Sequence, residues 1–262
     1  MMKFKTDHDL HIHSFLSLCA DNDTDQNKYN ILKYAEENGF NTICITDHYW
    51  DSAVPGASEW YVPQNFENIS KIKPLPQSEG IRFLFGCETE LDKNCTLAIP
   101  KERFDDFDFI IIPTTHMHMN GLTVNGDENA EERAKLWAER FDAVLDMDLP
   151  FEKIGIAHLS CPLIYIGHYL DVLKAIPVSE YRRLFKKAAK VGVGIELNFN
   201  SLKMSDGEFE ENLRMYRAAK AEGCKFYFGS DSHHPSGFEN AKKNFEKIAK
   251  ALELEETDKF MI

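Results

Sequence analysis

Residues 41–48 read Asn-Thr-Ile-Cys-Ile-Thr-Asp-His, and the pattern of this short stretch indicates the class of fold. Its first six residues are rich in β-branched side chains and predict a buried strand over Asn41–Thr46. Asp47 and His48 follow at once, and both are side chain types that can bind a metal. A buried strand with chemically active side chains directly after it is typical of an α/β barrel, in which the carboxyl ends of the strands form the active face.

Short apolar runs of the same kind recur along the chain and alternate with longer amphipathic stretches. The other predicted strands are Asp9–Ile12, Ile81–Cys87, Phe107–Ile112, Lys153–Ala157, Gly192–Asn198 and Cys224–Gly229, with Cys95–Ile99 as a candidate hairpin partner. The predicted helices are Tyr29–Asn38, Glu128–Asp146, Ser179–Val191 with Ser179 as N-cap, Phe209–Glu222 and Asn240–Leu254. Seven strand–helix units predict a parallel, closed or nearly closed α/β barrel, and an open doubly wound sheet is the alternative.

Composition narrows the class of protein. The chain has 262 residues, 43% of them apolar, which suits one barrel with a large core. The formal net charge is −13 and no basic run occurs, so we expect no nucleic-acid partner. A phosphorylated substrate remains compatible with this charge, because bound divalent metals can reverse the local field.

The cysteines and the apolar segments indicate a reducing compartment. None of the six cysteines forms a CxxC pair, and Cys44 and Cys87 lie inside apolar runs, as reduced core thiols do. The first residues lack a signal-peptide pattern, and no apolar stretch approaches the roughly 18 residues of a membrane span. We therefore expect a cytoplasmic protein without a membrane partner; its oligomeric state is left open.

Most of the ten histidines, and several carboxylates, fall at the predicted strand ends. These candidate ligands are His11, His13, His48, Glu88, His116, His118, His158, Asp231 and His233. Side chains two residues apart in a strand point to the same side. His11 and His13 can therefore both reach one metal, and so can Asp231 and His233. Imidazole and carboxylate suit zinc, iron and manganese, and cooperating metals about 3.5–4 Å apart suit displacement at phosphorus. A single such pair is weak evidence, whereas the whole set predicts a metal site; His8 and His168 are read as core or surface histidines.

Five short motifs carry a family resemblance. They are Asp9-Leu-His-Ile-His13, Ile45-Thr-Asp-His48, Gly86-Cys-Glu88, Ile156-Ala-His158 and Gly229-Ser-Asp-Ser-His233. In this order they resemble the motifs of the PHP (polymerase and histidinol phosphatase) superfamily, over residues 9 to 234.

The resemblance implies a distorted, TIM-like (β/α)7 barrel, with residues 1–262 as a single PHP-type metallohydrolase domain. It implies two or three divalent metal ions, whether zinc, iron or manganese, and cleavage of phosphate esters. The implied ligands are His11, His13, His48, Glu88, His116, His158, Asp231 and His233, with Glu88 as the bridging carboxylate.

The sequence departs from the family pattern in two places. Family members usually have a further histidine or aspartate soon after the first pair, where this chain reads Ser17-Leu-Cys-Ala-Asp-Asn-Asp23. We expect Asp21 to be that metal ligand, because hard metals prefer carboxylate to thiolate, with Cys19 and Asp23 as rivals. The second departure is the pair His116 and His118, of which we favour His116 as ligand and leave the role of His118 open.

Residues near the strand ends invite less specific interpretations. Asp47 could orient His48 or simply form a turn, and Glu196 with Asn198 could be a structural hydrogen-bonding pair at the same mouth. Trp50, Trp60 and Tyr61 could line the pocket, and Lys203 is a candidate phosphate contact or a solvated lysine. The segments Asn65–Pro76 and Pro162–Pro177 could cover the site.

The leading functional hypothesis is hydrolysis of a small phosphomonoester, with histidinol phosphate as the best single guess, by attack of a metal-bridging hydroxide. Glu88, His158 and His233 are the candidate catalytic residues, although metal ligation would compromise either histidine as a proton donor. The alternatives are a phosphodiester hydrolase and an amidohydrolase-type enzyme acting on carbon–nitrogen or ester bonds. A non-catalytic regulatory domain is disfavoured because nearly all the ligands are present.

Overall fold

The computed structural model describes residues 3–198 and 206–262, so Lys203 lies outside the described residues. The strands are β1 (His8–Ile12), β2 (Thr42–Ile45), β3 (His48–Tyr49), β4 (Arg82–Thr89), β5 (Phe109–Ile112), β6 (Ile154–Ile156), β7 (Gly194–Leu197) and β8 (Lys225–Phe228). The helices are α1 (Lys28–Asn38), α2 (Phe66–Ile69), α3 (Ala130–Asp146), α4 (Tyr169–Ala175), α5 (Val178–Val191), α6 (Asp206–Ala221) and α7 (Ala241–Ala251).

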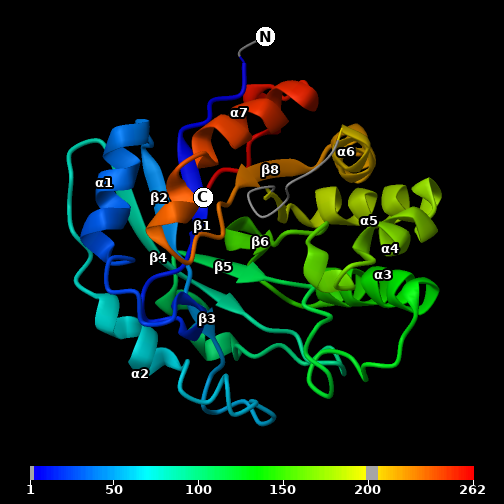
Figure 1. Ribbon diagram of the computed structural model, residues 1–262, viewed down its shortest axis with the longest axis horizontal. Helices are drawn as coiled ribbons and strands as arrows, with labels where there is room; N and C mark the ends of the chain where they lie inside the picture. The colour runs from blue at the N-terminus through cyan, green and yellow to red at the C-terminus, as the bar shows by residue number, and fades with distance from the viewer. Residues whose placement is uncertain (1–2, 199–205) are drawn as a thin grey trace.

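The strands form a parallel sheet in the order β1-β2-β4-β5-β6-β7-β8, with the short β3 paired to β4 (Figure 1). The sheet curls until its two ends meet. Asp231 N donates to His11 O at 2.8 Å and His13 N donates to Ser232 O at 3.0 Å, which joins the end of β1 to the chain after β8. The expected barrel is therefore confirmed, and the open doubly wound alternative is wrong.

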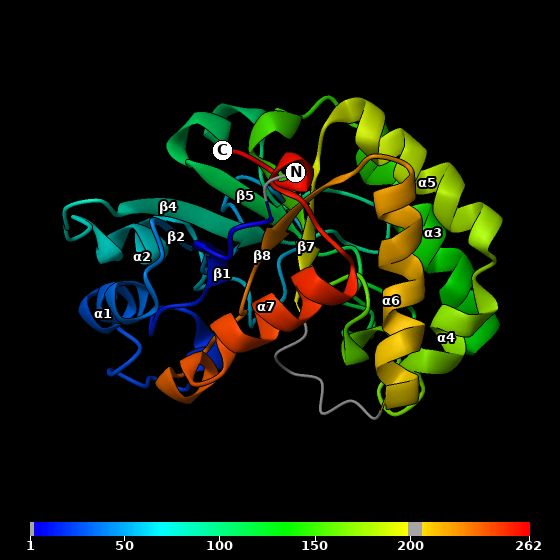
Figure 2. The ribbon, with the colours of Figure 1, turned by 90° about the horizontal axis from the view of Figure 1, so that it is seen from above.

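Helices surround the sheet, with α1 and α2 on one side and α3 to α6 on the other (Figure 2). Buried apolar residues of the helices and strands join in one large core cluster, which is why the strands read as nearly continuous apolar runs. A smaller cluster includes Leu10, Phe109, Tyr227 and Phe260. Phe260 N donates to Phe226 O at 2.8 Å, which fastens the last residues of the chain to β8.

Most predicted elements are present, with shifts at their ends. Gly39 ends α1 in the left-handed region at φ 63°, where glycine is the usual C-cap residue. The prediction of Ser179 as an N-cap is wrong, because α5 begins at Val178 and Pro177 is its N-cap. The candidate hairpin partner Cys95–Ile99 does not form a strand, but Leu97 makes an antiparallel bridge to Leu91, and Ala98 N donates to Glu90 O at 2.8 Å.

Helices α2 and α4 and strand β3 were not predicted from the sequence. Helix α2 lies in the segment Asn65–Pro76, and α4 lies in Pro162–Pro177. Strand β3 has two residues, too short for a periodic pattern. Within the described ranges, no helix combines the length and apolar character needed to cross a membrane.

Candidate metal centre

The predicted ligands converge at one end of the barrel because they sit at the carboxyl ends of neighbouring strands. His11 and His48 belong to β1 and β3, Glu88 to β4, and the others follow β1, β5, β6 and β8. Three groups of side chains place their ligand atoms within 4.8 Å of one another. The groups are His11, His13, Glu88 and Asp231; Glu88, His116 and His158; and His13, Cys19, His48 and His233.

Glu88 lies at the centre, with one histidine set at each carboxylate oxygen. Its Oε2 lies 3.0 Å from His48 Nδ1, 3.4 Å from His13 Nε2 and 3.5 Å from His11 Nε2. Its Oε1 lies 3.2 Å from His158 Nε2 and 3.8 Å from His116 Nε2. A carboxylate with nitrogen ligands at both oxygens has the arrangement needed to bridge two cations.

Unsatisfied polar atoms show that these residues fit a metal. Glu88 Oε2 and His48 Nδ1 are buried and, although 3.0 Å apart, neither makes a well-directed hydrogen bond among the described residues. The Nε2 atoms of His11 and His13 lie 3.2 Å apart and both approach Asp231 Oδ1, at 3.4 and 3.1 Å. Buried polar atoms are nearly always satisfied, and a divalent cation would satisfy all of these.

Four of the histidines are oriented through Nδ1, so that Nε2 faces the centre. The pairs are His11 with Glu196 at 2.8 Å, His13 with Ser17 at 3.1 Å, His116 with Glu90 at 2.9 Å and His158 with Thr115 at 3.0 Å. An acceptor at Nδ1 holds the ring proton there and leaves the Nε2 lone pair for a metal.

Asp47 supports this arrangement through Ser17. Its carboxylate accepts from Ser17 Oγ and from the N–H and Oγ of Ser14, each at 2.7 Å. Ser17 Oγ in turn accepts from the backbone N–H of His48 at 3.1 Å. Asp47 therefore orders the loop that carries His13 and contributes to the position of His48 through the backbone.

The electrostatics couple the carboxylates to the histidines. Burial alone would lower the pKa of His11, but Glu196, Asp231 and Glu88 outweigh it and raise that pKa. Burial would raise the pKa of Glu88, yet His48 and His11 hold it well below its usual range. Glu88 is therefore ionised and available as an anionic ligand at neutral pH.

The loop after β1 presents Cys19 to the centre. The 3-10 helix η1 (Leu18–Ala20) carries Cys19, whose sulfur belongs to the third ligand group. Asp21, the expected ligand, lies in the left-handed region at φ 48°, is exposed and belongs to none of the three groups. Asp23 is 3.0 Å from His234 Nδ1 and is likewise outside the groups. The positions of these side chains favour Cys19 as the ligand. The prediction of Asp21 rested only on the preference of hard metals for carboxylate over thiolate.

A small cavity of about 170 Å³ opens onto the centre. Its lining includes Trp60, Tyr61, His118, Met119 and Leu163 in addition to ligand candidates. His118 is exposed and its ring stands edge-on to that of His116, 5.5 Å between centroids. Trp50 is buried away from this cavity, and the Pro162–Pro177 segment contributes Leu163 to it.

The remaining histidines have ordinary roles. His8 is buried, and its Nε2 accepts from the N–H of Phe228 at 3.0 Å, so it is a satisfied core histidine. His168 lies 3.4 Å from Asp171 on the exposed surface.

Comparison with known proteins assigns the chain to a family. The PHP domain model matches residues 9–200, which is most of the chain. The chain belongs to the PHP domain family. A curated relative, a probable phosphatase from Clostridium acetobutylicum, is 26% identical over 257 residues, covering 97% of this chain and 88% of the relative.

A solved structure shares the fold of this PHP domain. It is histidinol phosphate phosphatase from Lactococcus lactis, complexed with zinc, L-histidinol and phosphate, with a TM-score of 0.62 and 17% sequence identity. The similarity covers 98% of this chain and 99% of the other, so the barrels correspond over their full length.

The outer partners of the histidines were largely missed from the sequence. Glu90, Ser17 and Thr115 contact His116, His13 and His158, and none of the three stood out as a motif. Glu90 could have been found, because it is two residues after Glu88 and therefore points to the same side of an extended chain.

Proposed function

We propose that this PHP domain is a metal-dependent phosphatase that hydrolyses a small phosphomonoester, and that residues 1–262 form one such domain. The proposal rests on Glu88, a buried carboxylate that has histidine nitrogens near both of its oxygens. Family membership and the relative named a probable phosphatase support the same reaction class.

The residues divide into two sets that share Glu88. His11, His13 and Asp231 would hold one divalent cation, and His116 and His158 would hold a second. Metals bound there would lower the pKa of a water molecule and neutralise negative charge on the phosphoryl oxygens. Glu196, Ser17, Glu90 and Thr115 keep the rings in place, so little reorganisation is needed when the substrate arrives.

The two histidines considered as proton donors differ in position. His158 is buried, with Nδ1 on Thr115 and Nε2 on Glu88, so both of its nitrogens are engaged. His233 is partly exposed and lines the cavity. We propose that His158 acts as a metal ligand alone, and that His233 lies on the side of the centre that faces the substrate.

The size of the cavity favours a small substrate. Its volume of about 170 Å³ lies below the usual range of roughly 300–1,000 Å³ for drug-sized ligands. Histidinol phosphate, which the name of the Lactococcus lactis enzyme gives as its substrate, is one candidate.

The test is phosphate release from a panel of phosphomonoesters that includes histidinol phosphate, with phosphodiesters and amides as competing substrates. The Glu88→Gln variant is compared with Glu37→Gln, which changes an exposed surface glutamate. We expect monoester hydrolysis that is lost with Glu88→Gln and unchanged with Glu37→Gln. Hydrolysis of diesters or amides in preference to monoesters would overturn the proposal.

A further inference from the structure

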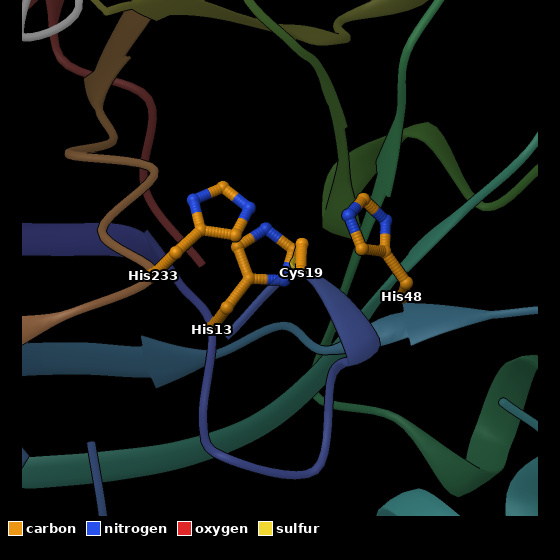
Figure 3. A group of neighbouring side chains, drawn as sticks. All are labelled: His13, Cys19, His48 and His233. Carbon is orange, nitrogen blue, oxygen red and sulfur yellow. The ribbon is translucent and has the colours of Figure 1, made fainter. Parts of the chain in front are cut away.

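The third ligand group differs from the other two because it contains a sulfur atom. Figure 3 shows Cys19 and three histidines, His13, His48 and His233, gathered at the end of the barrel. The ring centroids of His13 and His233 are 4.3 Å apart, and those of His13 and His48 are 4.4 Å apart. The side chains come from three separate segments, so the fold and not local sequence brings them together.

A second observation indicates that these residues face a ligand. His48 is buried, and its Nδ1 lies 3.0 Å from Glu88 Oε2 but makes no well-directed hydrogen bond in the described part of the chain. Cys19, His48 and His233 also line the cavity that opens onto Glu88. The imidazole nitrogen of His48 lacks a well-directed hydrogen bond and lies beside the thiol of Cys19 and the imidazole of His233. Together these three groups form a donor set typical of a metal site.

His13 is already committed to the neighbouring group. Its Nε2 lies 3.1 Å from Asp231 Oδ1 and 3.4 Å from Glu88 Oε2, and its Nδ1 is held by Ser17. Cys19, His48 and His233 belong to no other ligand group, and they remain as three protein ligands for a further cation. Three protein ligands with a fourth position open to a cavity are typical of catalytic zinc sites.

We propose that Cys19, as thiolate, binds a divalent metal together with His48 and His233, and that this site selects zinc over manganese and magnesium. The inference rests on the proposed metal-dependent function, and it identifies the metal that one part of the centre takes. When the sulfur–metal bond forms, the S–H bond breaks and its proton leaves to solvent. Soft thiolate favours zinc, whereas manganese and magnesium prefer oxygen ligands.

The spectroscopic test uses the full-length protein loaded with Co²⁺ in place of its metals. Cobalt bound to thiolate gives a near-ultraviolet charge-transfer band, which cobalt bound only to histidine and carboxylate lacks. We expect this band in the wild type and its loss in Cys19→Ser. Cys95→Ser and Cys161→Ser are matched controls: Cys95 is half-buried elsewhere, and Cys161 is the thiol beside His158. Both should keep the band.

Metal counting under native mass spectrometry completes the test. Cys19→Ser should bind one zinc ion fewer than the wild type, and Cys19→His should regain that ion without regaining the cobalt band. Circular dichroism of each variant checks that the barrel is folded. A wild-type protein without the band, or a band that persists in Cys19→Ser, would overturn the inference. A normal band in a protein that releases no phosphate would instead refute the proposed function and leave the thiolate site standing.

Discussion

Glu196 offers a sharp test of how the outer residues control the centre. Its two carboxylate oxygens receive three donors: Oε2 accepts from His11 Nδ1 at 2.8 Å and from the Tyr227 hydroxyl at 3.1 Å, and Oε1 accepts from His158 N at 3.3 Å. All of these groups are buried. The Glu196→Gln variant keeps the shape of the side chain but replaces one acceptor oxygen with an NH₂ group.

The amide cannot satisfy all three donors. With its oxygen towards His11, the NH₂ group faces the backbone N–H of His158; with its oxygen towards His158, the NH₂ group faces His11 Nδ1. In the second orientation His11 must carry its proton on Nε2, which is the atom that faces Glu88 and Asp231. Loss of such a partner costs about 10- to 100-fold in metal affinity, or about 1.4–2.7 kcal/mol.

The assay is competition for zinc between the protein and a chromophoric chelator. Glu196→Gln should weaken binding at the Glu88 centre by the stated factor. Tyr227→Phe is the control, because it removes one donor and leaves the contact between Glu196 and His11 in place. Equal zinc affinities in the wild type and Glu196→Gln would show that Glu196 does not control how His11 binds the metal.

Three further predictions concern the barrel that supports the site. Burial lowers the pKa of His8. Below pH 6.5 the unfolded chain therefore binds a proton at His8 that the folded chain does not bind, and the free energy of unfolding should fall as the pH falls below 6.5. The His8→Gln variant should lack up to about 1.4 kcal/mol per pH unit of this dependence in urea unfolding; parallel curves would contradict the assignment. Gly229→Ala should abolish metal binding, because a Cβ there would lie 2.5 Å from His11 Cβ and 2.8 Å from Glu196 Cδ; full metal occupancy measured by elemental analysis would show that the packing can yield. Arg140 is buried and donates to four backbone carbonyl groups, so Arg140→Met should lower the free energy of unfolding by about 3 kcal/mol or more, and a loss under 1 kcal/mol would count against this role.

The barrel could be predicted from the sequence because its strands are short, apolar and regularly separated by amphipathic helices. The position of the candidate ligands could be predicted for the same reason, since parallel strands bring their carboxyl ends to one face. Asn41–Thr46 with His48, and Ile81–Cys87 with Glu88, show this rule at work: the strands are present and both side chains lie at the centre.

The details that the sequence left open depend on backbone turns and tertiary contacts. Asp21 and Cys19 are two residues apart in one loop, and the left-handed conformation of Asp21 turns its side chain outwards. No periodic pattern encodes that turn. The contact between Glu196 and His11 could not be predicted from the sequence either. The two residues are 185 positions apart and come together only when the barrel closes.

Metal-dependent hydrolysis is tested by elemental analysis and phosphate release on one batch of protein. The wild type, stripped by chelation and reconstituted with zinc, manganese or iron, is compared with His11→Ala. We predict at least two metal ions per wild-type chain, phosphate release in proportion to bound metal, and loss of both in His11→Ala. A wild-type chain that binds no metal after reconstitution, or that hydrolyses phosphomonoesters equally well without metal, would contradict the account.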